Sequence, residues 1–309
     1  SDNRSDNTPI PWGALSGLAV DPGDDDTVYT IHDSFYVDSL IYAMDVSQQP
    51  AVITDEIVLK DGSLNVSLDQ EGIAVSASGD GSFWVASEGA GSVDDPGRPV
   101  TSNNIVVHAE ASGNILDIVT LPASVNAKQR RFGFEGVASV MEDGDEILYV
   151  VFQREWVGDP DDRVRIGRYD TSSRDWTFAY YPINLPLSPR GGWVGLSEIT
   201  ALGGGEFAVI ERDNQANADA RIKTIYKFSV DGVVFREDGQ TFDTVSKTLV
   251  DDLMDDLAAL NGAILEKIEG MAVTSKGDTL IVNDNDGVDD SNGETQLLRL
   301  KGLFNAGNN

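Results

Sequence analysis

Residues 69–88 read DQEGIAVSASGDGSFWVASE, and variants of this pattern occur four more times along the chain. Each copy opens with a small polar or acidic residue, usually followed by glycine, and then an apolar residue and alanine. After a short gap comes an apolar run that ends in a polar residue. Short apolar runs separated by turn residues are typical of β-strands joined in a hairpin. A hairpin that recurs throughout a chain predicts a repeat architecture.

The five copies open at Ser16, Glu71, Glu135, Glu198 and Glu269, which are separated by 55, 64, 63 and 71 residues. Further strand-like runs follow the copies, such as residues 104–108 and 115–119 after the one quoted above. Four antiparallel strands repeated around an axis form the blades of a β-propeller. We therefore predict an all-β, five-bladed β-propeller that forms a single domain over residues 1–309. A six-bladed propeller is the alternative.

The longest interval, between the fourth and fifth copies, contains a different pattern. Its leucines follow the spacing of one helix face and stand at Leu249, Leu253, Leu257 and Leu260. This predicts one helix inserted near residues 247–265, packed on the propeller through the leucines. A role of the leucine stripe in binding a partner is the alternative.

The repeat also places acidic residues at a shared end of the blades. In a hairpin the first strand begins where the second strand ends, so the opening residue of a copy and its last polar residue lie together. Small residues in the first strand suit the crowded position next to the axis. We therefore expect the strand ends to converge on the mouth of the propeller tunnel. The predicted ring of metal-binding carboxylates consists of Asp33, Glu71, Glu88, Glu135, Glu198, Glu211, Glu269 and Asp284.

Like charges gathered at one tunnel mouth are costly unless a cation compensates them. The chain has no cysteine and only two histidines, which excludes thiolate and multi-histidine metal sites. Oxygen ligands select hard cations, so we predict that the ring binds Ca²⁺, with Asp213 and Asp286 completing the shell. The alternative is that these carboxylates only accept backbone N–H bonds from a neighbouring blade.

The net charge narrows the range of partners. The chain has 22 Lys and Arg residues against 52 Asp and Glu residues, a formal charge of −30. A surface this negative repels nucleic acid and anionic lipid and attracts divalent cations. No run of 18 apolar residues occurs, so we expect no membrane span. A solvated, salt-adapted surface is the simpler explanation of the acidity.

Basic residues stand beside several copies, and guanidinium groups next to a calcium cluster would suit a phosphate ester. The residues are Lys128, Arg130, Arg131, Arg154, Arg190 and Arg212. Ion pairing with the acidic surface is the alternative.

Five segments resemble the phytase-like family, which is described by the esterase-like activity of phytase. They are residues 15–33, 69–89, 133–153, 196–214 and 267–286. The resemblance implies a secreted or periplasmic bacterial β-propeller with metal-dependent phosphoesterase activity. In calcium-dependent propeller phytases, clustered carboxylates hold ions that bind the substrate phosphate and activate water. The chain departs from the recurring Glu-Gly pair at Ser16 and Ile199.

Together, the residues and the resemblance predict a Ca²⁺-dependent phosphoesterase that acts as a monomer on a small phosphorylated substrate. The candidate catalytic residues are Glu135, Glu269, Arg131 and Arg212. A non-catalytic calcium-binding or interaction propeller is the alternative, and a sugar lactonase or glycosidase is a third reading.

Overall fold

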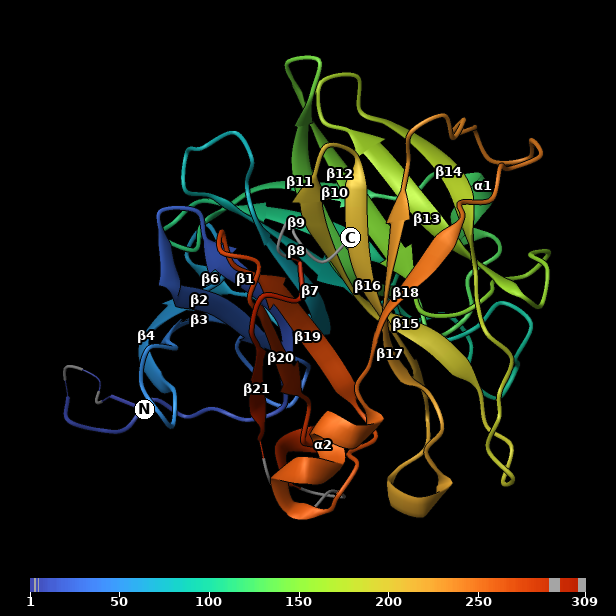
Figure 1. Cartoon of the computed structure of the whole chain (residues 1–309). Helices are drawn as coiled ribbons and strands as arrows, with labels where there is room; N and C mark the ends of the chain where they lie inside the picture. The colour runs from blue at the N-terminus through green and yellow to red at the C-terminus, as the bar shows by residue number, and fades with distance from the viewer. Residues whose placement is uncertain (3, 5, 289–294, 305–309) are drawn as a thin grey trace. The chain divides into compact units, whose positions relative to one another are not determined.

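The computed structural model describes residues 1–309 except 3, 5, 289–294 and 305–309. The chain is nearly all-β and has a five-bladed β-propeller arrangement, which confirms the fold predicted from the repeat. The two apolar runs of each copy of the repeat form adjacent strands of one antiparallel sheet (Figure 1). The chain divides into two compact units, and a single domain over its whole length stays a prediction.

The first unit comprises residues 1–87, 106–119 and 269–309. Its first sheet has the order β1 (Leu15–Asp21), β2 (Asp24–His32), β3 (Leu40–Asp45) and β4 (Val52–Val58). The second sheet has the order β10 (Ile115–Thr120), β9 (Ile105–Ala109), β8 (Phe83–Ser87) and β7 (Gln70–Val75). The last has the order β19 (Ile268–Val273), β20 (Thr279–Asn283) and β21 (Leu297–Leu300), and the short strands β5 (Lys60–Asp61) and β6 (Leu64–Asn65) pair separately.

The second unit comprises residues 88–105 and 120–268. One sheet has the order β11 (Phe134–Glu142), β12 (Asp145–Phe152), β13 (Arg163–Asp170) and β14 (Asp175–Pro182). The other has the order β15 (Val194–Gly203), β16 (Glu206–Asp213), β17 (Lys223–Ser229) and β18 (Lys247–Asp252). The helical elements of the described chain are α1 (Ala123–Asn126), α2 (Met254–Asn261) and the 3₁₀ turns η1 (Asn217–Asp219) and η2 (Asp286–Val288).

Apolar side chains between the sheets form the core of each unit. In the second unit, Tyr149, Ile166 and Phe207 belong to one buried cluster. In the first unit, one cluster joins Leu18 and Tyr42 to residues of β19 and β20, and another contains Ile73.

The glycine of the repeat is explained by the close approach of neighbouring strands. A Cβ atom added to Gly17 would lie 2.9 Å from the backbone nitrogen of Ile73, and one added to Gly136 would lie 2.6 Å from that of Ile199. Real Cβ atoms do not approach backbone this closely, so a larger residue would force the strands apart. The second residue of the Glu-Gly pair thus sets how closely the first strands of successive blades pack.

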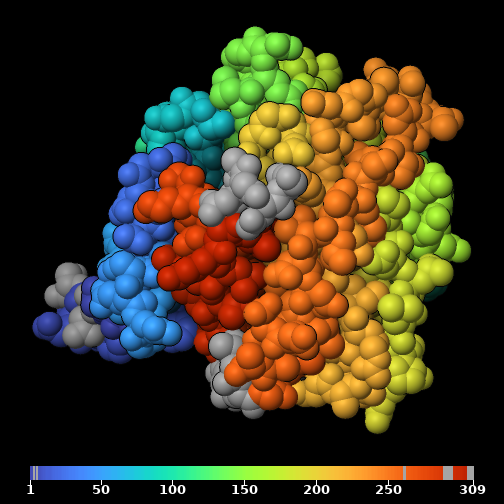
Figure 2. All heavy atoms as spheres, viewed as in Figure 1, coloured from blue at the N-terminus to red at the C-terminus, as the bar shows by residue number. Residues whose placement is uncertain are grey.

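The inserted helix is present but shorter than predicted. Residues 247–252, expected as its first part, instead form β18, because pairing with β17 supplies the outer strand of the fourth blade. Leu249 therefore lies 53% exposed on a strand, whereas Leu253 and Leu257 are buried as the stripe predicts. The helix lies at the surface (Figure 2, orange), with Asp255 and Asp256 in its first turn. The side chain of Leu260 is outside the described residues.

Within the described residues, no helix is long and apolar enough to cross a membrane.

Candidate metal centre

Two strand ends of the first unit bring three carboxylates together. β2 ends at His32 and β20 ends at Asn283, so Asp33 and Asp284 are the first residues after their strands. Asp286 follows in the turn η2. Oxygens of Asp33, Asp284 and Asp286 all lie within 4.8 Å of one another. Asp284 is buried and the other two are half-buried. We call these three residues the Asp284 group.

The loop that carries Asp284 and Asp286 is fixed by its own hydrogen bonds. Asp284 Oδ1 accepts the backbone N–H of Asp286 at 2.7 Å. The side-chain oxygen of Asn285 accepts the N–H groups of Ala14 at 2.7 Å and Gly287 at 3.2 Å. Asn285 therefore ties this loop to the segment that precedes β1.

Aromatic side chains stand beside the Asp284 group. Asp33 Oδ1 accepts the N–H of Phe35 at 2.6 Å, and the Phe35 ring lies on the backbone of Gly287. Phe35 is 43% exposed and contacts Tyr36 edge-to-face, with 5.0 Å between the ring centroids. Trp12, 44% exposed, precedes the segment that Asn285 holds. The carboxylates are thus bordered by apolar surface that is open to water.

The donor set of the Asp284 group fits a hard cation. Its three ligand side chains offer carboxylate oxygens alone, the donors that Ca²⁺ and Mg²⁺ prefer. Zinc and copper sites are built from imidazole or thiolate, and the group contains neither. Three like charges within 4.8 Å repel each other, so a cation bound there would relieve the repulsion.

A second pair of carboxylates in the first unit adjoins the start of β7. Oxygens of Asp69 and Glu71 also lie within 4.8 Å of each other. Ser16 Oγ donates to the backbone oxygen of Glu71 at 2.9 Å and to its Oε2 at 3.2 Å. Ser16, which departs from the repeated glutamate, therefore acts as a hydrogen-bond donor to the glutamate of the next blade.

Glu269 is buried near the start of β19. β20, the neighbouring strand in the sheet, ends at Asn283, so Glu269 and Asp284 lie at the same end of the fifth blade. This is the placement that the hairpin argument predicted for the opening and closing residues of one copy.

In the second unit, Glu135 and Glu198 lie at neighbouring strands and are both buried. A Cβ atom added to Gly136 would lie 2.7 Å from Glu198 Oε1, so the Glu198 carboxylate lies against the backbone that follows Glu135. Glu198 Oε1 also accepts the N–H of Ile199 at 2.8 Å. Glu88, at the start of this unit, accepts the N–H of Gly133 at 2.7 Å. A ring that joins all eight predicted carboxylates stays a prediction.

Glu211 is also buried, and basic and hydroxyl groups surround it. Lys247 Nζ lies 2.6 Å from Glu211 Oε2, and the hydroxyl of Tyr181 donates to the same oxygen at 3.0 Å. The N–H of Asn184 donates to Oε1 at 3.0 Å. Burial lowers the pKa of Lys247, and the Glu211 charge opposes that shift. Lys247 therefore supplies a positive charge to the Glu211 carboxylate, whose role as a metal ligand stays a prediction.

Asp213, predicted to complete the metal shell, is paired in the same way. Lys223 Nζ lies 2.9 Å from Asp213 Oδ1 and donates further hydrogen bonds to the carbonyl oxygens of Asp213 and Glu266. Burial and the neighbouring Arg212 guanidinium lower the pKa of Lys223 to about 8, against the opposing effect of Asp213.

Sequence reasoning missed Lys223 and Lys247. Both lie in outer strands of the fourth blade, at distances of 10 and 36 residues from their partners. The available signal was weak: lysines are rare in so acidic a chain, and these two open strands β17 and β18, where a lysine that is drawn inward needs a partner.

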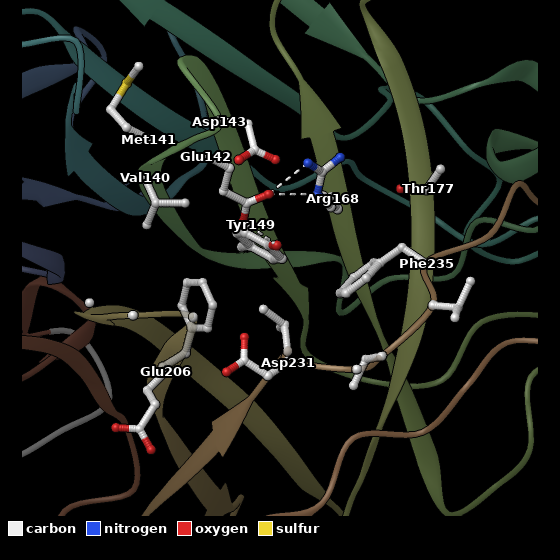
Figure 3. Close-up of a pocket in the computed structure, with 18 residues that line it drawn as sticks. Val140, Met141, Glu142, Asp143, Tyr149, Arg168, Thr177, Glu206, Asp231 and Phe235 are labelled. Atoms are coloured by element: carbon white, nitrogen blue, oxygen red, sulfur yellow. Dashed lines mark hydrogen bonds and ion pairs between the residues drawn. The ribbon is translucent and has the colours of Figure 1, made fainter.

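A cavity of about 930 Å³ lies among the hairpin turns of the third and fourth blades, at the end opposite to Glu135 and Glu198 (Figure 3). Glu142 accepts hydrogen bonds there from Tyr149 at 2.6 Å and from Arg168 at 2.7 Å. None of the predicted site residues lines this cavity.

Comparison with known proteins identifies one family. The family model described as "Phytase-like: Esterase-like activity of phytase" matches residues 10–287. No curated protein matches the chain.

Three solved structures are similar in fold at low identity. The GH43 endo-arabinanase from Bacillus licheniformis is 14% identical with a TM-score of 0.49, and the match covers 97% of this chain and 96% of that chain. The gluconolactonase XC5397 from Xanthomonas campestris is 13% identical with a TM-score of 0.44, and the match covers 94% of this chain and 76% of that chain. The allergen Mala s 1 of Malassezia sympodialis is 10% identical with a TM-score of 0.44, and the match covers 91% of this chain and 90% of that chain. Likeness at this level carries no argument about activity.

Proposed function

The chain belongs to this phytase-like family, and on that premise we propose that it is a Ca²⁺-dependent phosphoesterase whose cation is held by the Asp284 group. The observation that supports the proposal is the gathering of Asp33, Asp284 and Asp286 within 4.8 Å. These residues come from the two strand ends at which the repeat predicts metal ligands. Their all-oxygen donor set fits calcium rather than zinc or copper.

A bound calcium ion would supply positive charge that neutralises a phosphate group and polarises its P–O bonds. The protein's own contribution is to fix the ligands beforehand. Asn285 holds the Asp284 loop against Ala14, and the N–H of Phe35 orients Asp33. A preformed site of this kind avoids the entropic cost of ordering its ligands when the ion binds.

We assign Glu269 the role of proton acceptor for the attacking water. It is buried, it carries a carboxylate, and it lies at the same end of the fifth blade as Asp284. General bases of this type commonly accelerate a reaction by about 10²- to 10⁴-fold. Glu135 occupies the equivalent repeat position in the second unit and remains a candidate for the same role.

Hydrolysis of 4-nitrophenyl phosphate tests the proposal. Protein stripped with a chelator should be inactive and should regain activity when Ca²⁺ is added. Asp284→Asn and Glu269→Gln should each lower kcat by about a hundredfold. Asp55→Asn, at an exposed aspartate of the same unit, is the control and should keep full activity. Hydrolysis that is unaffected by chelation and by Asp284→Asn would refute the proposal.

The second candidate function is a calcium-binding module without catalysis. The hydrogen bond from Ala14 to Asn285 favours it, because the same loop joins parts of the chain 271 residues apart. An ion bound there would then serve only to close the structure. In that case Ca²⁺ would raise the thermal unfolding temperature, and no phosphate, lactone or glycoside substrate would be turned over.

A further inference from the structure

We propose that the cavity among the hairpin turns of the third and fourth blades binds an organic cation, an ammonium group attached to an aromatic or alkyl body. All of its lining residues lie in the second unit, and none of them belongs to the predicted carboxylate ring. The proposal concerns binding alone and requires neither a bound calcium ion nor turnover, so it stands or falls separately from the proposed function.

The size of the cavity suits a small molecule. Its volume of about 930 Å³ lies within the range of small-molecule sites, about 300–1,000 Å³. Strand β13 contributes Arg168 and β14 contributes Thr177, while the turns after β11 and β15 and the segment after β17 form the border. Because parts of two blades enclose the cavity, a small ligand seated there would contact protein on several sides.

Aromatic rings form the apolar side of the cavity. The ring centroid of Tyr149 lies 4.5 Å from that of Phe207 and 5.6 Å from that of Phe235. Tyr149 and Phe207 belong to the buried core cluster of this unit, and Phe235 packs against it. The rings are therefore held in place by the core. Aromatic ring faces attract cations as well as apolar groups.

Carboxylates accompany the rings. Of the described lining residues, one is basic, Arg168, and four are acidic: Glu142, Asp143, Glu206 and Asp231. Arg168 donates to Glu142 at 2.7 Å, so the base is matched by one of the four carboxylates. The other three are exposed, and they form no ion pair with the part of the chain that the structure describes. The cavity therefore carries an excess of negative charge, which attracts cations.

The basic residues beside the motifs do not neutralise this charge. Three of them pair with acidic residues elsewhere: Lys128 with Asp238, Arg130 with Asp94 and Arg190 with Asp219. Arg131 lies over the ring of Phe132 at 4.2 Å, and Arg212 lies over the ring of Trp193 at 5.4 Å. None of these residues lines the cavity.

The charges are unevenly placed within the cavity. Figure 3 shows Arg168 beside Glu142 at one side, and Glu206 and Asp231 at the other. A Cβ atom added to Gly205 would lie 2.8 Å from Asp231 Oδ1, so the glycine lets this carboxylate lie against the turn. We therefore expect the ammonium group beside Glu206 and Asp231, away from Arg168, with its body against the rings.

The spacing of the carboxylates favours an organic cation over a metal ion. In the described chain, no three of the four cavity carboxylates bring oxygens within 4.8 Å of one another, in contrast to the Asp284 group. A bare calcium or magnesium ion needs several oxygens at about 2.0–2.6 Å. An organic cation can instead use separated carboxylates through its charge and the rings through its body.

Titration calorimetry with phenethylammonium chloride, in about 0.15 M NaCl and EDTA, tests the site. The salt screens the general attraction of a cation to this acidic surface, and EDTA removes divalent ions. The full chain should bind the compound saturably. Phenethyl alcohol, which has the same body without the charge, and tetramethylammonium, which has the charge without the body, should each bind at least about tenfold more weakly.

Two double variants that remove equal charge locate the binding. Glu206→Gln with Asp231→Asn should weaken phenethylammonium binding by about tenfold. Asp161→Asn with Glu237→Gln is the matched control, because both residues are exposed and lie in the same unit but outside the cavity. Its affinity for phenethylammonium should equal that of the unmodified chain.

Phe235→Leu keeps every charge and should also weaken binding, by about threefold, because it removes one ring from the cavity. Three outcomes would overturn the proposal: no saturable binding by the unmodified chain, equal losses in the two double variants, or equal affinity for phenethylammonium and phenethyl alcohol. The comparison of the three compounds uses the unmodified chain, so it decides the matter even where a variant fails to fold.

Discussion

The same repeat position has different neighbours in the two units. In the first unit, the residues that close the β2 and β20 strands, Asp33 and Asp284, lie beside each other and beside Asp286. In the second unit, the residue that closes the fourth copy, Glu211, lies against Lys247, and Asp213 two residues later lies against Lys223. One region gathers like charges, and the other pairs Glu211 and Asp213 with lysines.

The difference teaches that an acidic repeat specifies where carboxylates lie but not what neutralises them. A carboxylate paired with a lysine needs no cation from solution, because the ion pair offsets part of the cost of burying both charges. Carboxylates gathered at one strand end offer the several oxygen ligands that a hard cation requires. The comparison therefore supports the proposal that the cation binds at the Asp284 group rather than at Glu211 or Asp213.

Removing one lysine should produce the largest effect on stability. Lys223→Met leaves the Asp213 carboxylate buried without its cation, which typically costs about 3–5 kcal/mol of unfolding free energy. Adding Asp213→Asn removes that charge and should restore more than half of the loss. Urea unfolding of both variants measures the difference. If the double variant is less stable than Lys223→Met, the pairing account of this region is wrong.

Glu211→Gln should have a smaller effect, about 1.5–3 kcal/mol, because the amide keeps the shape but loses the charge-assisted bond to Lys247. The control is Glu237→Gln, at a glutamate of the same unit for which no ion pair is described, and its stability should not change. A Glu211 variant as stable as the unmodified protein would show that this ion pair contributes nothing.

The smallest effect concerns pH. The pKa of Lys223 is about 8 in the folded chain and about 10.5 when unfolded, so between these values the unfolded chain binds more protons. The destabilising effect of the buried charge is fully present below pH 8 and fades as the pH rises. Stability should increase by roughly 1 kcal/mol per pH unit above pH 8. The Lys223→Met/Asp213→Asn variant should lack this increase when both proteins are unfolded at pH 8 and pH 9.

Much of this arrangement could be predicted from local pattern. The hairpin argument placed Asp33, Asp284 and Asp286 at one strand end because strand ends are fixed by the alternation of apolar runs and turns. It could not find Lys247, because the contact of that residue with Glu211 depends on the register of an outer strand 36 residues away. The prediction that Leu249 lies on a helix was wrong for a related reason, because pairing of its segment with β17 overrides the helical spacing of the leucines.

The surroundings of Arg131 and Arg212 were also beyond the sequence. Both residues were recognised from their proximity to the motifs, but nothing local indicates that Phe132 adopts a left-handed backbone or that its ring lies 5.0 Å from that of Trp193.

Calcium titration calorimetry on the chelator-stripped chain, with Asp284→Asn and Glu211→Gln beside it, tests the central claim most directly. We predict that the unmodified chain and Glu211→Gln bind Ca²⁺ with the same affinity, and that Asp284→Asn binds it at least about tenfold more weakly. Equal calcium affinity in the Asp284→Asn variant and the unmodified chain would contradict the assignment of the ion to the Asp284 group.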